Sequence, residues 1–276
     1  MTLAARSSPP EDGDTEARGA EASAAPSEIA PVLKFEKVGF SYDGRPVMRD
    51  VSFSVAPGEI LVLLGPSGCG KTTILNMVAG FLRPTEGVAV VDGREIAGPG
   101  PDRGVVFQAA ALFDWMSVAD NISFSLRCAG RRKAERRAVA EEMAALVGLK
   151  GFEDAYPYQL SGGMRQRVGL ARVLAARPKV MLMDEPFSAL DVQTRETLQE
   201  EVLRIRERTG CTILFITHAI DEAVFLGDRI FLLNDLSSGA YDRFDVALPA
   251  PRDQPENRLH PSFLRLRETI YRRMRH

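Results

Sequence analysis

Residues 60–72 read Ile-Leu-Val-Leu-Leu-Gly-Pro-Ser-Gly-Cys-Gly-Lys-Thr, an apolar run that leads directly into a glycine-rich segment. The first five residues, Ile60–Leu64, have the length of a buried strand. The rest fits the phosphate-binding pattern G-x4-G-K-[ST], in which glycines let backbone N–H groups surround phosphates and the next helix directs its positive end at them. We predict that this helix runs from about Lys71 to Ala79. The alternative, a glycine turn with a chance lysine, leaves the flanking strand and helix unexplained.

Two further groups of residues complete the predicted chemistry. We expect Lys71 to reach the terminal phosphates of a nucleotide and the Thr72 hydroxyl to ligate Mg²⁺. Val180–Glu185 is four apolar residues followed by two carboxylates. A buried strand that ends at Asp184 places a carboxylate where it can hold Mg²⁺, usually through water. Glu185 comes one residue later and points elsewhere, so it can polarise an attacking water as a general base.

The order of strands and helices predicts an α/β fold with a mainly parallel sheet. Val32–Tyr42 and Val47–Val55 read as strands around an Asp43-Gly44 hairpin turn, which gives an N-terminal antiparallel β region. Short strands are also expected at residues 88–91, 105–107, 180–183 and 212–217, and a helix is expected over Lys133–Val147. Because strands alternate with helices, ligands should bind at the carboxyl ends of parallel strands.

The composition is that of an ordinary globular chain. Of its 276 residues, 45% are hydrophobic and 26% charged, and the net charge of −2 argues against nucleic acid as a partner. No apolar run approaches the roughly 20 residues that span a bilayer, and the N-terminus lacks the layout of a signal peptide. We therefore expect a cytoplasmic protein that reaches a membrane only through partners. Three cysteines without metal-type spacing are consistent with reduced thiols.

A third motif narrows the class of phosphate-binding protein. Residues 160–167, Leu-Ser-Gly-Gly-Met-Arg-Gln-Arg, resemble the signature sequence of ABC ATPases. Ser161, Gly162 and Gly163 open a helix and so make a second anion-binding helix start. A protein with two separate anion-binding helix starts needs either two phosphates at one site or two chains for each nucleotide. The resemblance implies the second: a head-to-tail homodimer in which the signature of one chain covers the ATP held by the other.

Other landmarks of the ABC family follow in order. Gln108 resembles the glutamine that contacts Mg²⁺ and the attacking water. Asp191, at the end of Ser-Ala-Leu-Asp, resembles the loop that crosses the dimer interface. His218 ends a predicted strand and resembles the histidine that bonds the γ-phosphate. Tyr42 resembles the aromatic that stacks on adenine, although an edge-strand tyrosine is commonplace.

The resemblance therefore implies a complete ATP site with Mg²⁺. The expected catalytic residues are Glu185, His218, Gln108 and Lys71, and the expected metal ligands are Thr72, Gln108 and Asp184. The expected ATP-binding residues are Tyr42, Gly65, Pro66, Ser67, Gly68, Cys69, Gly70, Lys71, Thr72, Thr73, Ser161, Gly162, Gly163 and Asp191.

The resemblance also predicts the domain organisation. We expect a P-loop ATPase domain over residues 31–253, with an inserted helical subdomain at about 113–175. Residues 1–30 are rich in small and polar residues and read as a disordered tail. Residues 254–276 read as a C-terminal helical extension.

Within the family, the chain looks most similar to importers of nitrate, sulfonate, taurine and bicarbonate. Residues 98–108, 112–115 and 248–253 carry this likeness, whereas Asp114, Met164 and Ala219 depart from the usual letters. The likeness implies two transmembrane permease subunits, an extracytoplasmic solute-binding protein that acts indirectly, and a location on the cytoplasmic face of the membrane.

Two alternatives remain open at this stage. A soluble ABC ATPase of DNA repair or translation usually carries a long coiled-coil insertion or two ATPase domains, whereas here only 90 residues separate Lys71 from Ser161. A metabolic P-loop kinase would leave the second helix start and His218 unexplained.

Overall fold

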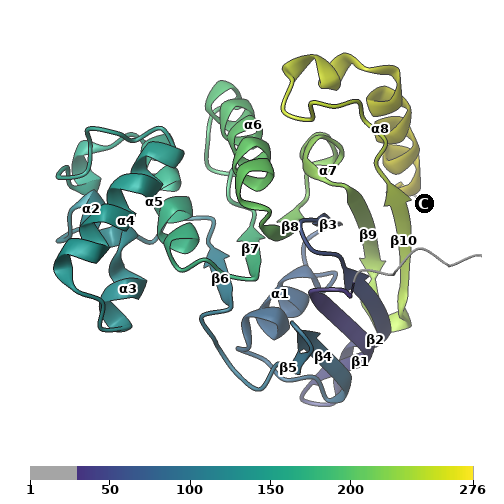
Figure 1. Ribbon diagram of the computed structural model, residues 1–276. Coiled ribbons are helices and arrows are strands. Elements are labelled where there is room, and N and C mark those ends of the chain that lie inside the picture. The colour runs from purple at the N-terminus through teal and green to yellow at the C-terminus, as the bar shows by residue number, and fades with distance from the viewer. Residues whose placement is uncertain (1–29, 276) are drawn as a thin grey trace, which may run out of the picture.

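The computed structural model describes residues 30–275, so the predicted tail lies outside the described residues except for Ala30. The strands are β1 (Leu33–Tyr42), β2 (Arg45–Val55), β3 (Ile60–Leu64), β4 (Glu86–Val91), β5 (Arg94–Glu95), β6 (Arg103–Val106), β7 (Val180–Asp184), β8 (Thr212–Thr217), β9 (Arg229–Asp235) and β10 (Ala240–Asp245). The α-helices are α1 (Lys71–Ala79), α2 (Val118–Ile122), α3 (Phe124–Cys128), α4 (Lys133–Leu146), α5 (Gly162–Ala175), α6 (Val192–Thr209), α7 (Ile220–Leu226) and α8 (Pro261–Arg273). Figure 1 shows their arrangement.

The larger sheet has the strand order β10-β9-β3-β8-β7-β6. Its five strands from β9 to β6 run parallel, and only β10 pairs antiparallel, at one edge. Both β3 and β8 are buried along their whole length, because helices cover one face of the sheet, and α1 with the smaller sheet covers the other. This explains why these strands read as continuous apolar runs rather than as alternating patterns. The predicted α/β fold with a mainly parallel sheet is confirmed.

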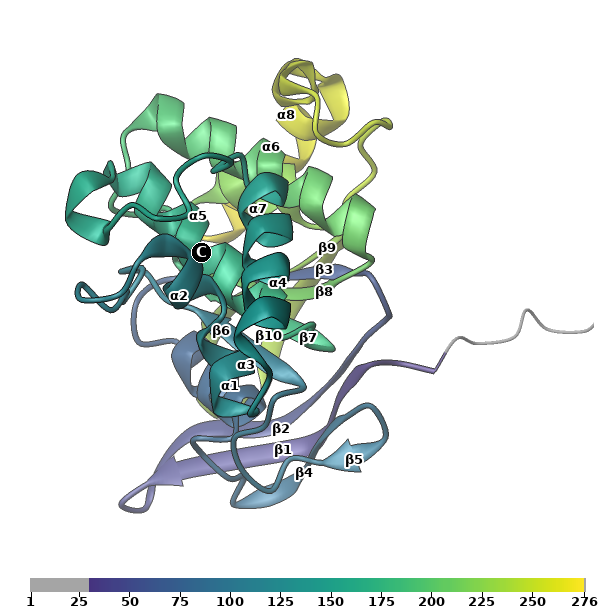
Figure 2. The same cartoon turned by 60° about the vertical axis from the view of Figure 1, so that its left-hand side comes forward.

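The smaller sheet is antiparallel, with the order β2-β1-β4-β5. Asp43 and Gly44 both have positive φ, 46° and 78°, which is the backbone that a two-residue hairpin turn requires. The predicted hairpin is therefore present, and β4 joins it on the far side of β1. This sheet lies beside α1 as a separate layer (Figure 2).

Two hydrophobic cores lie on opposite faces of the larger sheet. Successive residues of β3 point alternately into one core and the other. Ile60 and Val62 belong to the core with α5, α6 and α7, whereas Leu61 and Leu63 belong to the core with α1 and the smaller sheet. The helices α2, α3, α4 and α5 gather at one end of the molecule, on the left in Figure 1. Helix α4 corresponds to the segment predicted as Lys133–Val147.

The C-terminal helix α8 packs against α7 at the other end of the larger sheet. Phe263 and Ile270 of α8 are buried in the same core as the sheet and α7, and Arg273 pairs with Asp242 of β10 at 3.0 Å. The segment thus joins the main core directly. In the part of the chain that the structure describes, no helix has both the length and the apolarity needed to cross a bilayer.

We predict that α8 contributes to the stability of the whole chain. Ile270→Ala should lower the free energy of unfolding by about 2–5 kcal/mol, because a fully buried side chain is truncated. Leu264→Ala on the same helix is the control: this side chain is exposed, so its truncation should cost about 0.5 kcal/mol or less. Urea denaturation measures the free energy of unfolding of both variants. If Ile270→Ala changes it no more than Leu264→Ala does, α8 unfolds separately from the rest of the chain.

Candidate functional site

The glycine-rich loop lies between β3 and α1, and its glycines are sterically required. A Cβ at Gly65 would lie 2.2 Å from the carbonyl oxygen of Leu233 in β9, a distance that no side chain tolerates. Gly70, which precedes α1, has φ of 105°, a left-handed conformation that favours glycine. The loop therefore follows a path close to the neighbouring strand and then enters the helix.

Lys71 is held inside this loop by the loop's own backbone. Its Nζ donates hydrogen bonds to the carbonyl oxygens of Gly65 at 2.6 Å and Pro66 at 2.7 Å, and the residue is only 5% exposed. Pro66, Ser67, Gly68 and Thr72 are exposed, whereas Cys69 and Thr73 are buried. The loop thus presents its outer residues on an open surface, with one cation at its centre.

Three ionisable groups meet at the carboxyl ends of the strands next to this loop. In the order β3-β8-β7, Asp184 ends β7, and His218 follows β8 directly. Glu185 has φ of 44°, and its backbone N–H donates to Ile216 of β8 at 3.0 Å. This turn brings Glu185 Oε2 to 3.0 Å from His218 Nδ1.

The environment of Asp184 suits a cation. Burial raises the pKa of this carboxyl, the neighbouring Glu185 raises it further, and Lys71 opposes both effects. A divalent ion would stabilise the ionised carboxylate. Among residues 30–275, no three His, Cys, Asp or Glu side chains form a metal-binding group. The oxygens available here therefore suit an ion that takes most of its ligands from phosphates and water, as Mg²⁺ commonly does.

Gln108 follows β6 on the exposed surface. The preceding Phe107 is fixed from α5, because Gln166 Nε2 donates to its carbonyl oxygen at 3.1 Å. Gln108 lines a crevice together with Gly162 and Leu190. The residue thus lies where the large sheet meets the helical region.

The Ser161 turn begins α5 and faces the start of α6. The Ser161 hydroxyl accepts from the backbone N–H of Met164 at 3.3 Å, as the N-cap of α5. A Cβ at Gly163 would lie 2.7 Å from Thr194 of α6, and one at Gly162 would lie nearest to Leu190. This second helix start therefore contacts the loop that follows β7 and the start of α6.

Asp191 and Tyr42 have local roles that the sequence did not predict. Asp191 caps α6, because its Oδ1 accepts from the backbone N–H of Thr194 at 3.0 Å, and this bond lowers the pKa of the carboxyl. Tyr42 ends β1, is half exposed, and packs edge-on against Phe40 with ring centroids 4.7 Å apart. Their predicted contacts with nucleotide and partner chain stay predictions.

A group of buried polar residues behind His218 was missed by the sequence reasoning. Glu222 of α7 is 7% exposed and accepts a hydrogen bond from the Thr217 hydroxyl at 2.6 Å. Burial raises the pKa of Glu222, while the bond from Thr217 and the charge of Arg195 oppose this rise. The available signal was an acidic residue four positions after His218, directly before the apolar run Ala-Val-Phe-Leu of residues 223–226.

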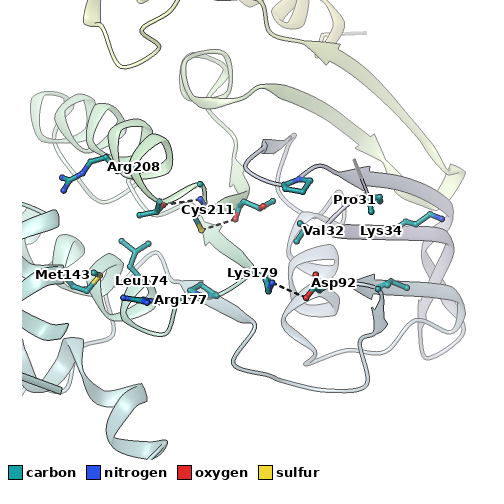
Figure 3. A pocket seen from close by; sticks show the side chains of 18 of the residues that line it. Pro31, Val32, Lys34, Asp92, Met143, Leu174, Arg177, Lys179, Arg208 and Cys211 are labelled. Atoms are coloured by element: carbon teal, nitrogen blue, oxygen red, sulfur yellow. Dashed lines mark hydrogen bonds and ion pairs between the residues drawn. The ribbon is translucent and has the colours of Figure 1, made fainter. Parts of the chain in front are cut away.

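A large hollow of about 1120 Å³ lies at the opposite edge of the sheet (Figure 3). Its lining includes Lys179, which precedes β7, and Cys211, which precedes β8, together with Met143 of α4. Lys179 pairs there with Asp92 at 3.4 Å. None of the residues predicted to bind nucleotide lines this hollow, so the candidate site is the open surface at the carboxyl ends of the strands.

The loop, the carboxylates at the end of β7 and the parallel sheet together define a P-loop nucleotide-binding protein. Comparison with known proteins narrows this class, because a family model described as ABC transporter matches residues 48–188. An uncharacterized ABC transporter ATP-binding protein of Methanocaldococcus jannaschii is 48% identical over 78% of this chain and 81% of its own length. The chain belongs to the ABC transporter family.

Two further relatives carry a more specific name. Taurine import ATP-binding proteins are 52% identical in Yersinia pestis, over 70% of this chain and 76% of theirs, and 45% identical in Pseudomonas putida, over 88% and 95%. The predicted likeness to this importer branch is confirmed. Among solved structures, cbiO1 from Clostridium perfringens, part of the ABC transporter complex cbiONQ, gives a TM-score of 0.73. It is 24% identical over 87% of this chain and 99% of its own, and it supports the fold.

Proposed function

We propose that this chain is the ATP-hydrolysing subunit of an importer for a small solute of the oxyanion type, such as a sulfonate, taurine, nitrate or bicarbonate. One observation carries the proposal: a phosphate loop and an acid–histidine pair share one edge of the sheet, while a second helix start lies apart from them. The names of the taurine import relatives support the sulfonate class.

The residues of the phosphate loop would bind ATP by exchanging partners. Lys71 now donates to two loop carbonyls, and phosphate oxygens are stronger acceptors for an ammonium group. The N-terminus of α1 adds backbone N–H groups aimed at the same anion. Tyr42 and the loop residues from Gly65 to Thr73 complete the proposed contacts.

Mg²⁺ would be held by Thr72, Asp184 and Gln108 together with the nucleotide. When bound, it neutralises phosphate charge and polarises the terminal phosphoryl group. Asp184 fits this role because its partly buried carboxylate ends β7, and because the charge of Lys71 only partly offsets the rise in its pKa that burial causes.

Glu185 and His218 would carry out the hydrolytic step. The Glu185 carboxylate accepts a proton from the attacking water, while His218 bonds the terminal phosphate. Glu185 Oε2 and His218 Nδ1 lie 3.0 Å apart and form a hydrogen bond with each other. Binding of the phosphate would therefore draw His218 from Glu185 and leave the carboxylate available to water.

The Ser161 helix start is proposed to serve the nucleotide of a second chain. Its nearest neighbours at Gly162 and Gly163 belong to Leu190 and Thr194 rather than to the phosphate loop. Both half-sites lie on exposed surface, so a two-fold homodimer would complete two equivalent sites. Closing and reopening of this dimer would then drive two permease subunits, which receive solute from an extracytoplasmic binding protein.

A surface for the permease is proposed beside Gln108. Trp115 is 74% exposed and lies against Phe113, with ring centroids 5.4 Å apart, and Phe113 in turn packs on Phe124 of α3. Exposed aromatic side chains on a firm base often anchor a partner helix. This contact would hold the chain at the cytoplasmic face of the membrane.

Glu185→Gln should retain ATP binding but lose hydrolysis, because an amide cannot accept the proton from water. Turnover should fall by at least about a hundredfold, with nucleotide affinity changed by less than about threefold. The variant should accumulate as an ATP-bound dimer in size-exclusion chromatography. Near-normal turnover would remove Glu185 from its proposed role.

Mixing two inactive variants tests the composite site. Lys71→Ala disables the phosphate loop and Ser161→Arg blocks the second helix start, so neither homodimer should hydrolyse ATP. In a mixed dimer, one site holds both defects and the other holds none, so part of the activity should return. Tagged pull-down confirms that mixed dimers form. A linked dimer of a wild-type and a Lys71→Ala chain keeps one intact site in either arrangement, so it shows whether one site suffices. If that linked dimer is active but mixing restores nothing, the trans arrangement is wrong.

Trp115→Ala should weaken co-purification with the permease by about tenfold while leaving basal ATPase activity near normal, since an exposed anchor is lost. Leu259→Ala is the matched control, because this side chain is equally exposed at the C-terminal end of the chain. Unchanged assembly in the Trp115 variant, or equal loss in both, would contradict the proposed surface.

A further inference from the structure

A buried polar network lies behind His218 and has no part in the mechanism above. Thr217 and Glu222 are 2% and 7% exposed, and Gln199 of α6 is 3% exposed. Charged and amide groups are rarely buried to this extent unless they are paired. The network therefore has a structural or positioning task that an apolar core would not perform.

The first half of the network fixes the turn that carries His218. The Thr217 hydroxyl accepts from the backbone N–H of Ala219 at 3.0 Å and donates to Glu222 Oε2 at 2.6 Å. One hydroxyl thus ties the residues on both sides of His218 to a carboxylate in α7. With the backbone held on both sides, the imidazole can move between Glu185 and a bound phosphate only by rotation of its own side chain.

The second half reaches the loop between β7 and α6. Glu222 Oε1 accepts from Gln199 Nε2 at 3.3 Å and forms an ion pair with Arg195 Nε at 3.8 Å. Arg195 also donates from its NH2 group to the carbonyl oxygen of Leu190 at 2.9 Å. Leu190 is the residue before Asp191 and lies nearest to Gly162. The Glu222 carboxylate therefore contacts Thr217, which holds the His218 turn, and Arg195, which holds the loop between β7 and α6.

We propose that Glu222 is a positioning residue that joins the His218 turn to the loop leading into α6. The inference rests on the proposed function, because both loops act on bound ATP there. Glu222 does not touch the reacting atoms. It sets the place of His218 through Thr217, and the place of Leu190 through Arg195, so that the two loops keep a fixed relation during turnover.

The proposal distinguishes a hydrogen-bonding role from simple packing. Thr217→Val keeps the shape of the side chain and removes the hydroxyl, whereas Thr217→Ser keeps the hydroxyl and removes a methyl group. If the network positions His218, the valine variant should lose kcat by about tenfold with KM within about twofold, and the serine variant should stay near the native kcat. If Thr217 only fills space in the core, Thr217→Ser should lose more kcat than Thr217→Val, because the missing methyl group leaves a small cavity.

The experiment measures kcat, KM and the thermal unfolding temperature of the full chain with both Thr217 variants and with Glu222→Gln. We expect Glu222→Gln to lose kcat as Thr217→Val does, because its uncharged amide no longer pairs with Arg195. Native kcat in Thr217→Val, or losses that only follow the unfolding temperature, would overturn the proposal. Failure of both Thr217→Val and Glu222→Gln to fold would assign the network to stability alone and also overturn it. Wild-type chain without ATPase activity would instead refute the proposed function.

Discussion

Parallel pairing of β3, β8 and β7 in one register is the constraint on which the candidate site depends. Because the strands run in the same direction, the phosphate loop, His218 and the Asp184-Glu185 pair all leave the sheet at the same edge. The hydrogen bond from Glu185 N–H to Ile216 extends this register one residue beyond β7. A shift of one residue in β7 would turn the Asp184 side chain to the opposite face of the sheet.

Much of this arrangement could be predicted from the sequence because each motif begins or ends a buried strand. The bounds of β3, α1 and β8 were predicted to the residue, since an apolar run with a polar or glycine boundary has a clear length. Strand β6 begins two residues before the predicted start and ends one residue before the predicted end, because Arg103 and Gly104 belong to the strand but are not apolar. The helices α6 and α7 were not predicted, because α6 is largely polar and α7 is only seven residues long.

Contacts between distant segments could not be predicted from local patterns. The ion pair of Arg195 with Glu222 and the packing of Gly163 against Thr194 each join residues whose spacing carries no periodic signal. The two hydrophobic cores likewise separate alternate residues of β3, which a continuous apolar run does not reveal. Such pairings follow from the assembled sheet and its covering helices.

The internal bonds of Lys71 have a consequence for the energetics of nucleotide capture. The ammonium group donates to the carbonyl oxygens of Gly65 and Pro66 and so ties the start of the loop to the start of α1. A nucleotide then replaces one set of acceptors with another, and little conformational entropy is lost in ordering the loop. Association should accordingly be limited by encounter with the open surface rather than by loop folding, and the free energy of phosphate contact remains available for closing one chain upon another.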